Sequence, residues 1–160
     1  MPSVLFVCTA NRFRSPIAAA LFLEKLQHVD GISAWHVESA GTWGDANLPP
    51  MKEALSEAGK RNLNIQTHLS KTINDKLMQE FDLILVMEAG HKEALINEFP
   101  GAEEKVYLLS EVGGGAPYSI PDPFFSKESA GDVAAEIEDL IDKKFDLIYH
   151  WFDNSKAFLK

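Results

Sequence analysis

The stretch that decides the fold is VLFVCTANRFRSP, residues 4–16. Its first four residues are all apolar, as in a strand buried on both faces of a parallel sheet. Ser15 and Pro16 make a favourable helix start, with serine at the N-cap and proline at the first helical position. A short loop beginning at Cys8 therefore joins a buried strand directly to a helix, which we expect over residues 16–28.

The rest of the chain repeats this alternation of short apolar runs and longer helical patterns. Further strands are expected at residues 34–38, 81–87 and 105–109. Further helices are expected at residues 50–58, where Gly59 would end the helix, at 73–79, at 90–99, and from 128 to near the C-terminus. This alternation predicts an α/β fold: a three-layer sandwich around a four-stranded parallel sheet, doubly wound in the flavodoxin-like manner, with helices on both faces.

Composition excludes several classes of protein. The chain has 160 residues and a formal net charge of −9, which argues against general nucleic-acid binding because that requires clustered cations. Its apolar runs are too short for a membrane span, and its first residues lack a signal-peptide pattern. The single cysteine, Cys8, excludes an internal disulfide and favours a reducing compartment. We expect one domain, residues 1–160, in the cytoplasm, with no nucleic-acid or membrane partner, no cofactor and no metal.

The sequence of the loop after the first strand favours an anion-binding site. Ligands of parallel sheets bind at the carboxyl ends of the strands, where Cys8 lies. A loop leading into a helix N-terminus can turn its N–H groups toward an anion, and Arg14 can grip two phosphate oxygens at once. The positive potential of these N–H groups and of Arg14 also stabilises the thiolate form of Cys8, which can attack phosphorus. The alternative is that Cys8 is a small buried hydrophobe at a strand end.

These residues resemble a known signature. The pattern from Cys8 to Pro16 is similar to the Cys-x5-Arg-Ser-Pro loop of the low-molecular-weight protein tyrosine phosphatases. A second element of that family, Asp-Pro followed by an aromatic residue, is present far downstream as residues 122–124. The length of the chain and the order of its strands and helices also agree with the family.

The resemblance implies a role for each reactive residue. Cys8 would be the nucleophile that forms a phosphocysteine, Arg14 would bind the phosphate, and Asp122 would protonate the leaving oxygen. A phenol has a pKa of about 10, so its expulsion as a bare anion is unfavourable, and a positioned acid typically gains about 10²–10⁴-fold. Without the cysteine loop, a simple turn would be the better interpretation of Asp122-Pro123.

The resemblance also implies residues around these three. Those expected to contact substrate are Thr9, Ala10, Asn11, Arg12, Phe13, Ser15, Trp43, Phe124 and Phe125. Ser39 and His68 are expected to support the loop together with Asn11, which tolerates a left-handed conformation. The aromatic members would flank a phosphotyrosine ring. The remaining histidines, including His91, are assigned no role.

Three loop positions depart from the family pattern. Ala10 replaces the usual glycine, which predicts strain if the position needs positive φ. Phe13 replaces a second cysteine, so a protective disulfide is excluded. Arg12 occupies a rim position that is aliphatic in many tyrosine phosphatases and threonine in the related arginine phosphatases, and its charge would favour substrates with acidic flanks.

The expected partners are phosphotyrosine-containing proteins, with phosphate or other oxyanions in the loop. A protein arginine phosphatase of the same fold and a non-catalytic phosphate- or phosphoprotein-binding module are the alternatives. A thioredoxin-coupled arsenate reductase would need further cysteines, which this chain lacks.

Overall fold

The centre of the molecule is a parallel sheet with the strand order β2-β1-β3-β4. The computed structural model describes residues 1–29 and 34–158, with side chains described as far as residue 152. The strands are β1 (Ser3–Cys8), β2 (His36–Gly41), β3 (Leu83–Val86) and β4 (Val106–Leu108). β1 is buried along its whole length, because it pairs with β2 on one side and β3 on the other. Its uniformly apolar sequence is therefore that of an inner strand.

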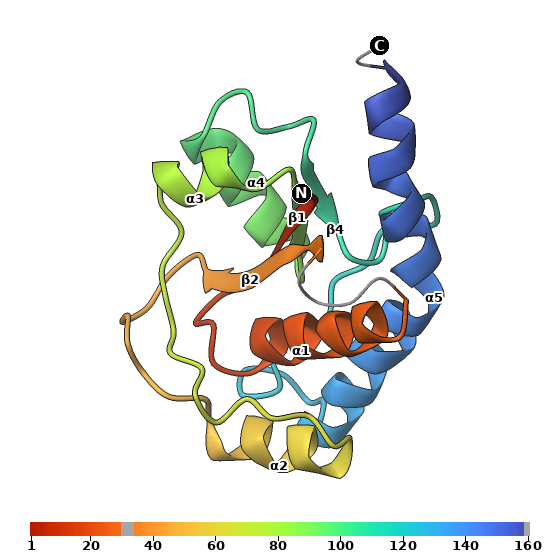
Figure 1. Cartoon of the computed structure of the whole chain (residues 1–160). Helices are drawn as coiled ribbons and strands as arrows, with labels where there is room; N and C mark the ends of the chain where they lie inside the picture. Colours follow the sequence, from red (N-terminus) through yellow and green to blue (C-terminus); the bar gives the residue numbers. More distant parts are fainter. Residues whose placement is uncertain (30–33, 159–160) are drawn as a thin grey trace.

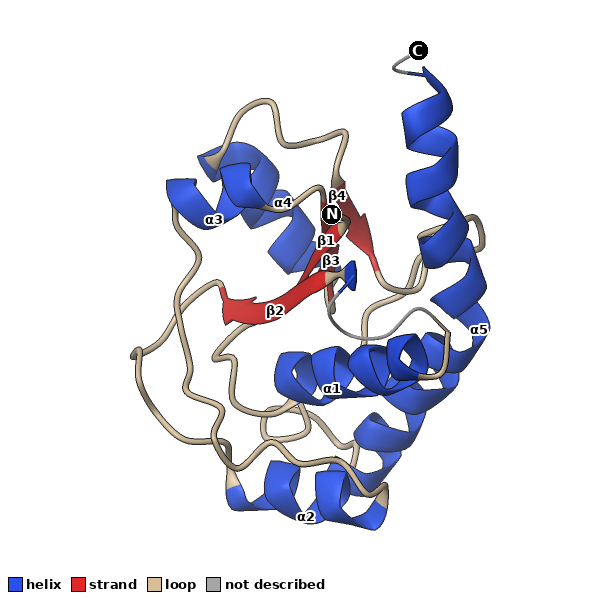
Figure 2. Cartoon of the chain, in the orientation of Figure 1, coloured by secondary structure: helices blue, strands red, loops and turns tan. Residues whose placement is uncertain are grey.

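Helices cover both faces of this sheet (Figures 1 and 2). They are α1 (Arg14–Gln27), α2 (Lys52–Lys60), α3 (Asp75–Glu80), α4 (Ala89–Glu98) and α5 (Ala130–Phe158). Alternate residues of β1 serve the two faces: Val4 and Phe6 pack in the cluster that contains α1 and α5, and Leu5 and Val7 in the cluster that contains α3 and α4. The predicted three-layer, doubly wound α/β fold is confirmed.

Aromatic side chains join the first and last helices to the sheet. The Phe22 ring of α1 lies 5.6 Å from Phe6 and 5.2 Å from Phe145 of α5, measured between ring centroids. Full burial of such a side chain contributes about 1.5–3 kcal/mol to stability.

Among the described residues, no helix combines the length and the apolar character that crossing a membrane would require.

Several helix ends lie one or two residues from their predicted positions, and two of them have a local structural cause. α1 begins at Arg14, two residues early, and its N-cap residue is Phe13, whose side chain makes no capping bond. Ser15 is not the cap, because its hydroxyl contacts the Cys8 sulfur and accepts from the Asn11 side chain. α2 runs through Gly59 to Lys60, and the left-handed residue that follows is Asn62, with φ of 58°. The other end of α1, at Gln27, lies one residue from the predicted end at residue 28.

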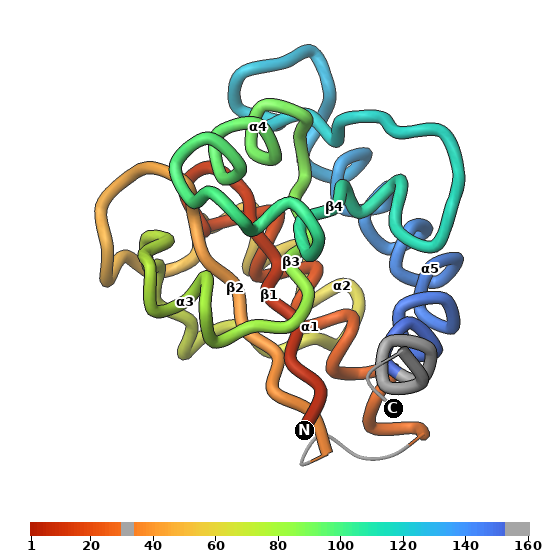
Figure 3. Tube along the Cα trace, turned by 90° about the horizontal axis from the view of Figure 1, so that it is seen from above, coloured from red at the N-terminus to blue at the C-terminus, as the bar shows by residue number. Residues whose placement is uncertain are grey.

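The topology opens a crevice at the carboxyl ends of β1 and β3. The chain leaves β1 toward β2 on one side and later returns to β3 on the other, so the loops after these two adjacent strands diverge. The backbone N–H of Met87, just after β3, donates to the Val7 carbonyl at 3.1 Å. Seen from above, the strands follow one another in the order β2, β1, β3 and β4, so β1 and β3 are neighbours (Figure 3).

Candidate active site

Residues 9–13, which we call the cysteine loop, turn their carbonyl groups toward the surrounding protein. Backbone N–H groups of the segment 42–51 donate to the carbonyls of Cys8, Thr9 and Arg12 at 2.9, 3.0 and 3.0 Å. The amide N–H groups of residues 9–13, by contrast, donate to no acceptor in the part of the chain that the structure describes. A run of unpaired amides leading into a helix N-terminus attracts an anion.

Asn11 holds the shape of the cysteine loop. It is fully buried and has φ of 60°, the left-handed conformation expected for it. Its amide nitrogen donates to Ser15 Oγ at 2.8 Å and Ser39 Oγ at 2.9 Å, and its side-chain oxygen accepts from the Lys71 backbone at 3.0 Å. The strain expected at Ala10 is absent, because the positive φ of the turn falls on Asn11, where asparagine tolerates it.

The Cys8 thiol lies at the floor of the loop, 2% exposed, with its sulfur 3.0 Å from Ser15 Oγ. Because Asn11 donates to this hydroxyl, the Ser15 hydrogen is left for an acceptor, and the sulfur at 3.0 Å is nearer than the Ala40 carbonyl at 3.4 Å. His68 braces the loop from outside, with Nε2 at 2.7 Å from the Asn11 carbonyl. Burial, and to a lesser degree the charge of Lys71, lowers the pKa of His68, which favours a neutral ring that donates from Nε2.

The end of β2 packs directly beneath the loop. A Cβ at Gly41 would lie 2.4 Å from the Thr9 carbonyl oxygen and 3.1 Å from the Ala10 carbonyl carbon, both of them backbone atoms. The close approach of loop and strand therefore requires glycine at this position.

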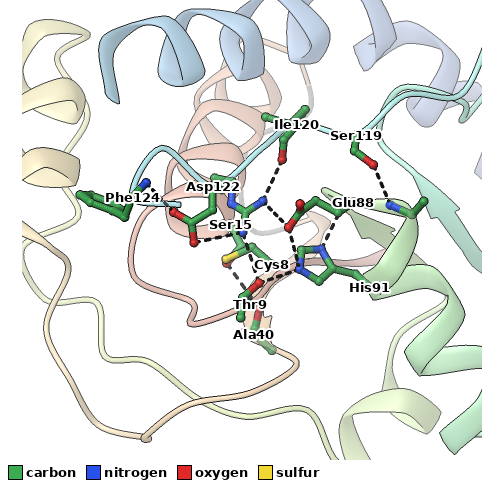
Figure 4. A network of polar contacts seen from close by, with 12 residues as sticks. Cys8, Thr9, Ser15, Ala40, Glu88, His91, Ser119, Ile120, Asp122 and Phe124 are labelled. Atoms are coloured by element: carbon green, nitrogen blue, oxygen red, sulfur yellow. Dashed lines mark hydrogen bonds and ion pairs between the residues drawn. The ribbon is translucent and has the colours of Figure 1, made fainter. Parts of the chain in front are cut away.

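The structure brings Asp122 to the guanidinium of Arg14, and Asp122 and Cys8 belong to one network of polar contacts (Figure 4). The Arg14 guanidinium is 2% exposed; Nη1 donates to the Ile120 carbonyl at 2.8 Å, and Nη2 lies 3.6 Å from Asp122 Oδ2. The other Asp122 oxygen accepts from the Phe124 backbone at 2.9 Å, which orients the carboxylate. Asp122 therefore lies beside Arg14 while its other oxygen contacts the backbone of the turn. The turn, which was the alternative interpretation of Asp122-Pro123, is compatible with a place in the site.

Two residues of this cluster were missed by the sequence analysis. Glu88 Oε2 lies 2.8 Å from Arg14 Nη1, and His91 Nε2 lies 2.8 Å from Thr9 Oγ1. The two side chains also interact through a capping box at the start of α4. The sequence analysis assigned His91 no role, and the structure places its ring in contact with Thr9 of the cysteine loop. The available signal was position, since both residues follow the second of the two strands that flank the crevice.

The electrostatics of this cluster keep His91 neutral. Burial and then the positive charge of Arg14 lower the pKa of His91 to about 4, although the carboxylates of Glu88 and Asp122 oppose the shift. Arg14 therefore lies between the carboxyl groups of Glu88 and Asp122, and the imidazole of His91 beside Glu88 is uncharged.

The expected aromatic walls form in part. The rings of Phe13 and Phe124 meet edge to face at 5.7 Å, so Phe124 packs on the cysteine loop. Trp43 binds Thr9 through its backbone, but its side chain is 77% exposed, and Phe125 is 91% exposed. Arg12 donates from Nε to the Pro49 carbonyl at 2.8 Å, which ties the loop to the segment after β2.

Residues 3–150 match the family of low molecular weight phosphotyrosine protein phosphatases. The chain belongs to this family. As a member it is a phosphatase and therefore a hydrolase.

Relatives of this phosphatase carry two substrate names. A protein-arginine-phosphatase of Bacillus subtilis (strain 168) is 31% identical over 121 residues, which are 76% of this chain and 79% of the relative. The crystal structure of a low molecular weight protein tyrosine phosphatase from T. tengcongensis covers 91% of this chain and 99% of its own, with a TM-score of 0.82 and 30% identity. Wzb of Vibrio vulnificus in complex with benzylphosphonate covers 91% and 97%, with a TM-score of 0.77 and 28% identity.

Proposed function

We propose that this phosphatase hydrolyses phosphotyrosine in proteins through a phosphocysteine formed on Cys8. The observation that carries the proposal is the gathering of a buried thiol, Arg14 and Asp122 around a loop whose amides are unpaired within the described chain. Simple binding of phosphate would need neither a thiol nor an acid, which favours catalysis over a binding module.

The first step transfers the phosphoryl group to sulfur. The Cys8 thiolate attacks phosphorus, the bond to the tyrosine oxygen breaks, and Asp122 gives its proton to that oxygen. The loop amides and the Arg14 guanidinium hold the phosphoryl oxygens as charge builds on them. The Ser15 hydroxyl, 3.0 Å from the sulfur, stabilises the thiolate before attack.

The second step returns the enzyme to its starting state. Water attacks the phosphocysteine, Asp122 accepts the proton of that water, and the sulfur–phosphorus bond breaks to release inorganic phosphate. Ser15 donates to the thiolate as it departs, which assists the breakage of the bond. The free thiol that this cycle requires is maintained in a reducing compartment, so we place the enzyme in the cytoplasm.

Phosphoarginine is the second candidate substrate, supported by the Bacillus relative that is named a protein-arginine-phosphatase. Two features of this chain favour phosphotyrosine. Arg12 in the cysteine loop would bring a second guanidinium group near that of a phosphoarginine, and like charges disfavour such an approach. The Phe13–Phe124 pair offers an apolar edge to an aromatic ring. The benzylphosphonate bound by the Vibrio relative, an aromatic phosphonate, supports the same choice.

The decisive experiment compares phosphate release from matched phosphotyrosine and phosphoarginine peptides in EDTA, with the wild type and Cys8→Ser side by side. We expect the wild type to cleave phosphotyrosine and the variant to be inactive. Cleavage of phosphoarginine alone would overturn the choice of substrate and leave the mechanism. Cleavage of neither peptide would favour the binding module.

A further inference from the structure

The buried imidazole of His91 has a defined protonation pattern. Its Nδ1 lies 3.1 Å from the backbone N–H of Glu88, and because a backbone N–H can only donate, Nδ1 must be the acceptor. The proton of the neutral ring is therefore on Nε2. The capping box at the start of α4 thus sets the tautomer that faces the active site.

The Nε2 proton points to the cysteine loop. Its nearest acceptor is Thr9 Oγ1 at 2.8 Å, and Glu88 Oε2 lies next at 3.3 Å. Thr9 Oγ1 also accepts from Arg14 Nη2 at 3.3 Å, so both acceptor positions of this hydroxyl are used. Hydrogen bonds therefore lead from His91 through Thr9 to the guanidinium of Arg14, and Figure 4 shows the contact between His91 and Thr9.

His91 also reaches the other side of Arg14. Glu88, which the imidazole contacts through both its backbone N–H and its carboxylate, forms the 2.8 Å ion pair with Arg14 Nη1. Two of the anchors of the guanidinium, Thr9 and Glu88, are therefore held by one side chain. Its other anchors, the Ile120 carbonyl and Asp122, belong to the acid-bearing segment.

We propose that His91 is a positioning residue for Arg14, holding Thr9 and Glu88 so that the guanidinium faces the anion held by the cysteine loop. This inference rests on the proposed function, in which Arg14 binds the transferring phosphoryl group. Without the imidazole, the Thr9 hydroxyl is free to rotate and the Glu88 carboxylate can draw the guanidinium away. A displacement of about 1 Å in such a group can cost about 10²-fold in rate.

The test uses two substitutions that each keep one half of the imidazole. His91→Asn keeps an acceptor near the position of Nδ1, so the helix cap survives and the contact with Thr9 is lost. His91→Gln extends an amide N–H toward the position of Nε2, so the contact with Thr9 is retained. Steady-state rates are measured with 4-nitrophenyl phosphate, together with inhibition by inorganic phosphate and the melting temperature of each variant. The exposed His28→Asn at the end of α1 is the control, and we expect it to match the wild type.

We expect His91→Asn to lower kcat/KM by about 10- to 100-fold and to weaken phosphate binding, with His91→Gln between this variant and the wild type. Thr9→Val should also lower kcat/KM, and the loss in the double variant should be smaller than the product of the two single losses, because both changes break the link through Thr9. A wild-type rate in His91→Asn, or multiplicative losses in the double variant, would overturn the proposal.

If His91→Asn does not fold, Thr9→Val replaces it, because this change leaves the helix cap intact. A wild-type rate in Thr9→Val then refutes the path from His91 through Thr9 to Arg14. An inactive wild type would instead refute the proposed function itself, so the two failures are distinguishable.

Discussion

The neutral state of buried His91 predicts a specific loss of stability in acid. In an unfolded chain this histidine has its ordinary pKa of about 6.5. In the folded protein, burial and then the charge of Arg14 lower the pKa to about 4. The carboxylates that face the ring, Glu88 and Asp122, oppose this shift without cancelling it. The perturbation we choose is His91→Asn, which removes the titrating group and retains an acceptor for the helix cap.

The sign and size follow from proton linkage. Between pH 6.5 and about 4 the unfolded chain binds a proton at His91 that the folded chain does not, so acid favours unfolding. The contribution of the neutral ring is complete above pH 6.5 and is lost as the pH falls toward the folded pKa. Each pKa unit corresponds to about 1.4 kcal/mol, so about 2–3 kcal/mol should disappear between about pH 6.5 and 4.5.

The assay is urea denaturation of the wild type and His91→Asn, followed by tryptophan fluorescence at several pH values from about 7.5 to 4.5. Other titrating groups, His68 among them, are common to both proteins, so the difference between the two curves isolates His91. We expect the wild type to lose about 2–3 kcal/mol more than the variant over this range. Parallel curves would refute the assignment of a buried, neutral histidine.

Three further predictions concern the loop and its acid. Asp122→Asn should lower kcat/KM, which reports the first phosphoryl transfer, by about 10²–10⁴-fold on phenyl phosphate and much less on 4-nitrophenyl phosphate, whose leaving group needs no proton; equal losses of kcat/KM on the two substrates would exclude the role of general acid. Gly41→Ala should destabilise the fold by about 1–3 kcal/mol and weaken phosphate binding, since the new Cβ would lie 2.4 Å from the Thr9 carbonyl oxygen. Thermal unfolding and phosphate titration measure both effects, and an unchanged melting temperature would contradict the tight packing. Arg12→Ala should selectively raise the KM for phosphopeptides with acidic flanks at low salt; equal KM values of the wild type for acidic and basic peptides would show that Arg12 does not select the flank.

The strand, the loop and the first helix could be predicted because their determinants are local. A four-residue apolar run specifies an inner strand whatever lies beside it, and alternation with helical patterns specifies a parallel sheet. The left-handed turn at Asn11 was also predictable, since few residues tolerate that conformation. The assignment of Ser15 to the helix cap was wrong. Serine is a preferred N-cap residue, but here tertiary contacts occupy its hydroxyl. Its hydroxyl contacts Cys8 and Asn11 instead, and the helix begins two residues earlier, with Phe13 as its N-cap residue.

The sequence by itself determined the fold class and pointed to Cys8, Arg14 and Asp122, because the loop pattern and the distant Asp-Pro element are both written in short, contiguous stretches. Only the tertiary structure decided that Glu88 and His91 complete the cluster. Their place depends on β3 pairing with β1, which sets the segment after one strand against the loop after the other. Such a contact between distant parts of the chain has no fixed spacing in sequence, so the packing of the sheet creates it and the residue pattern does not encode it.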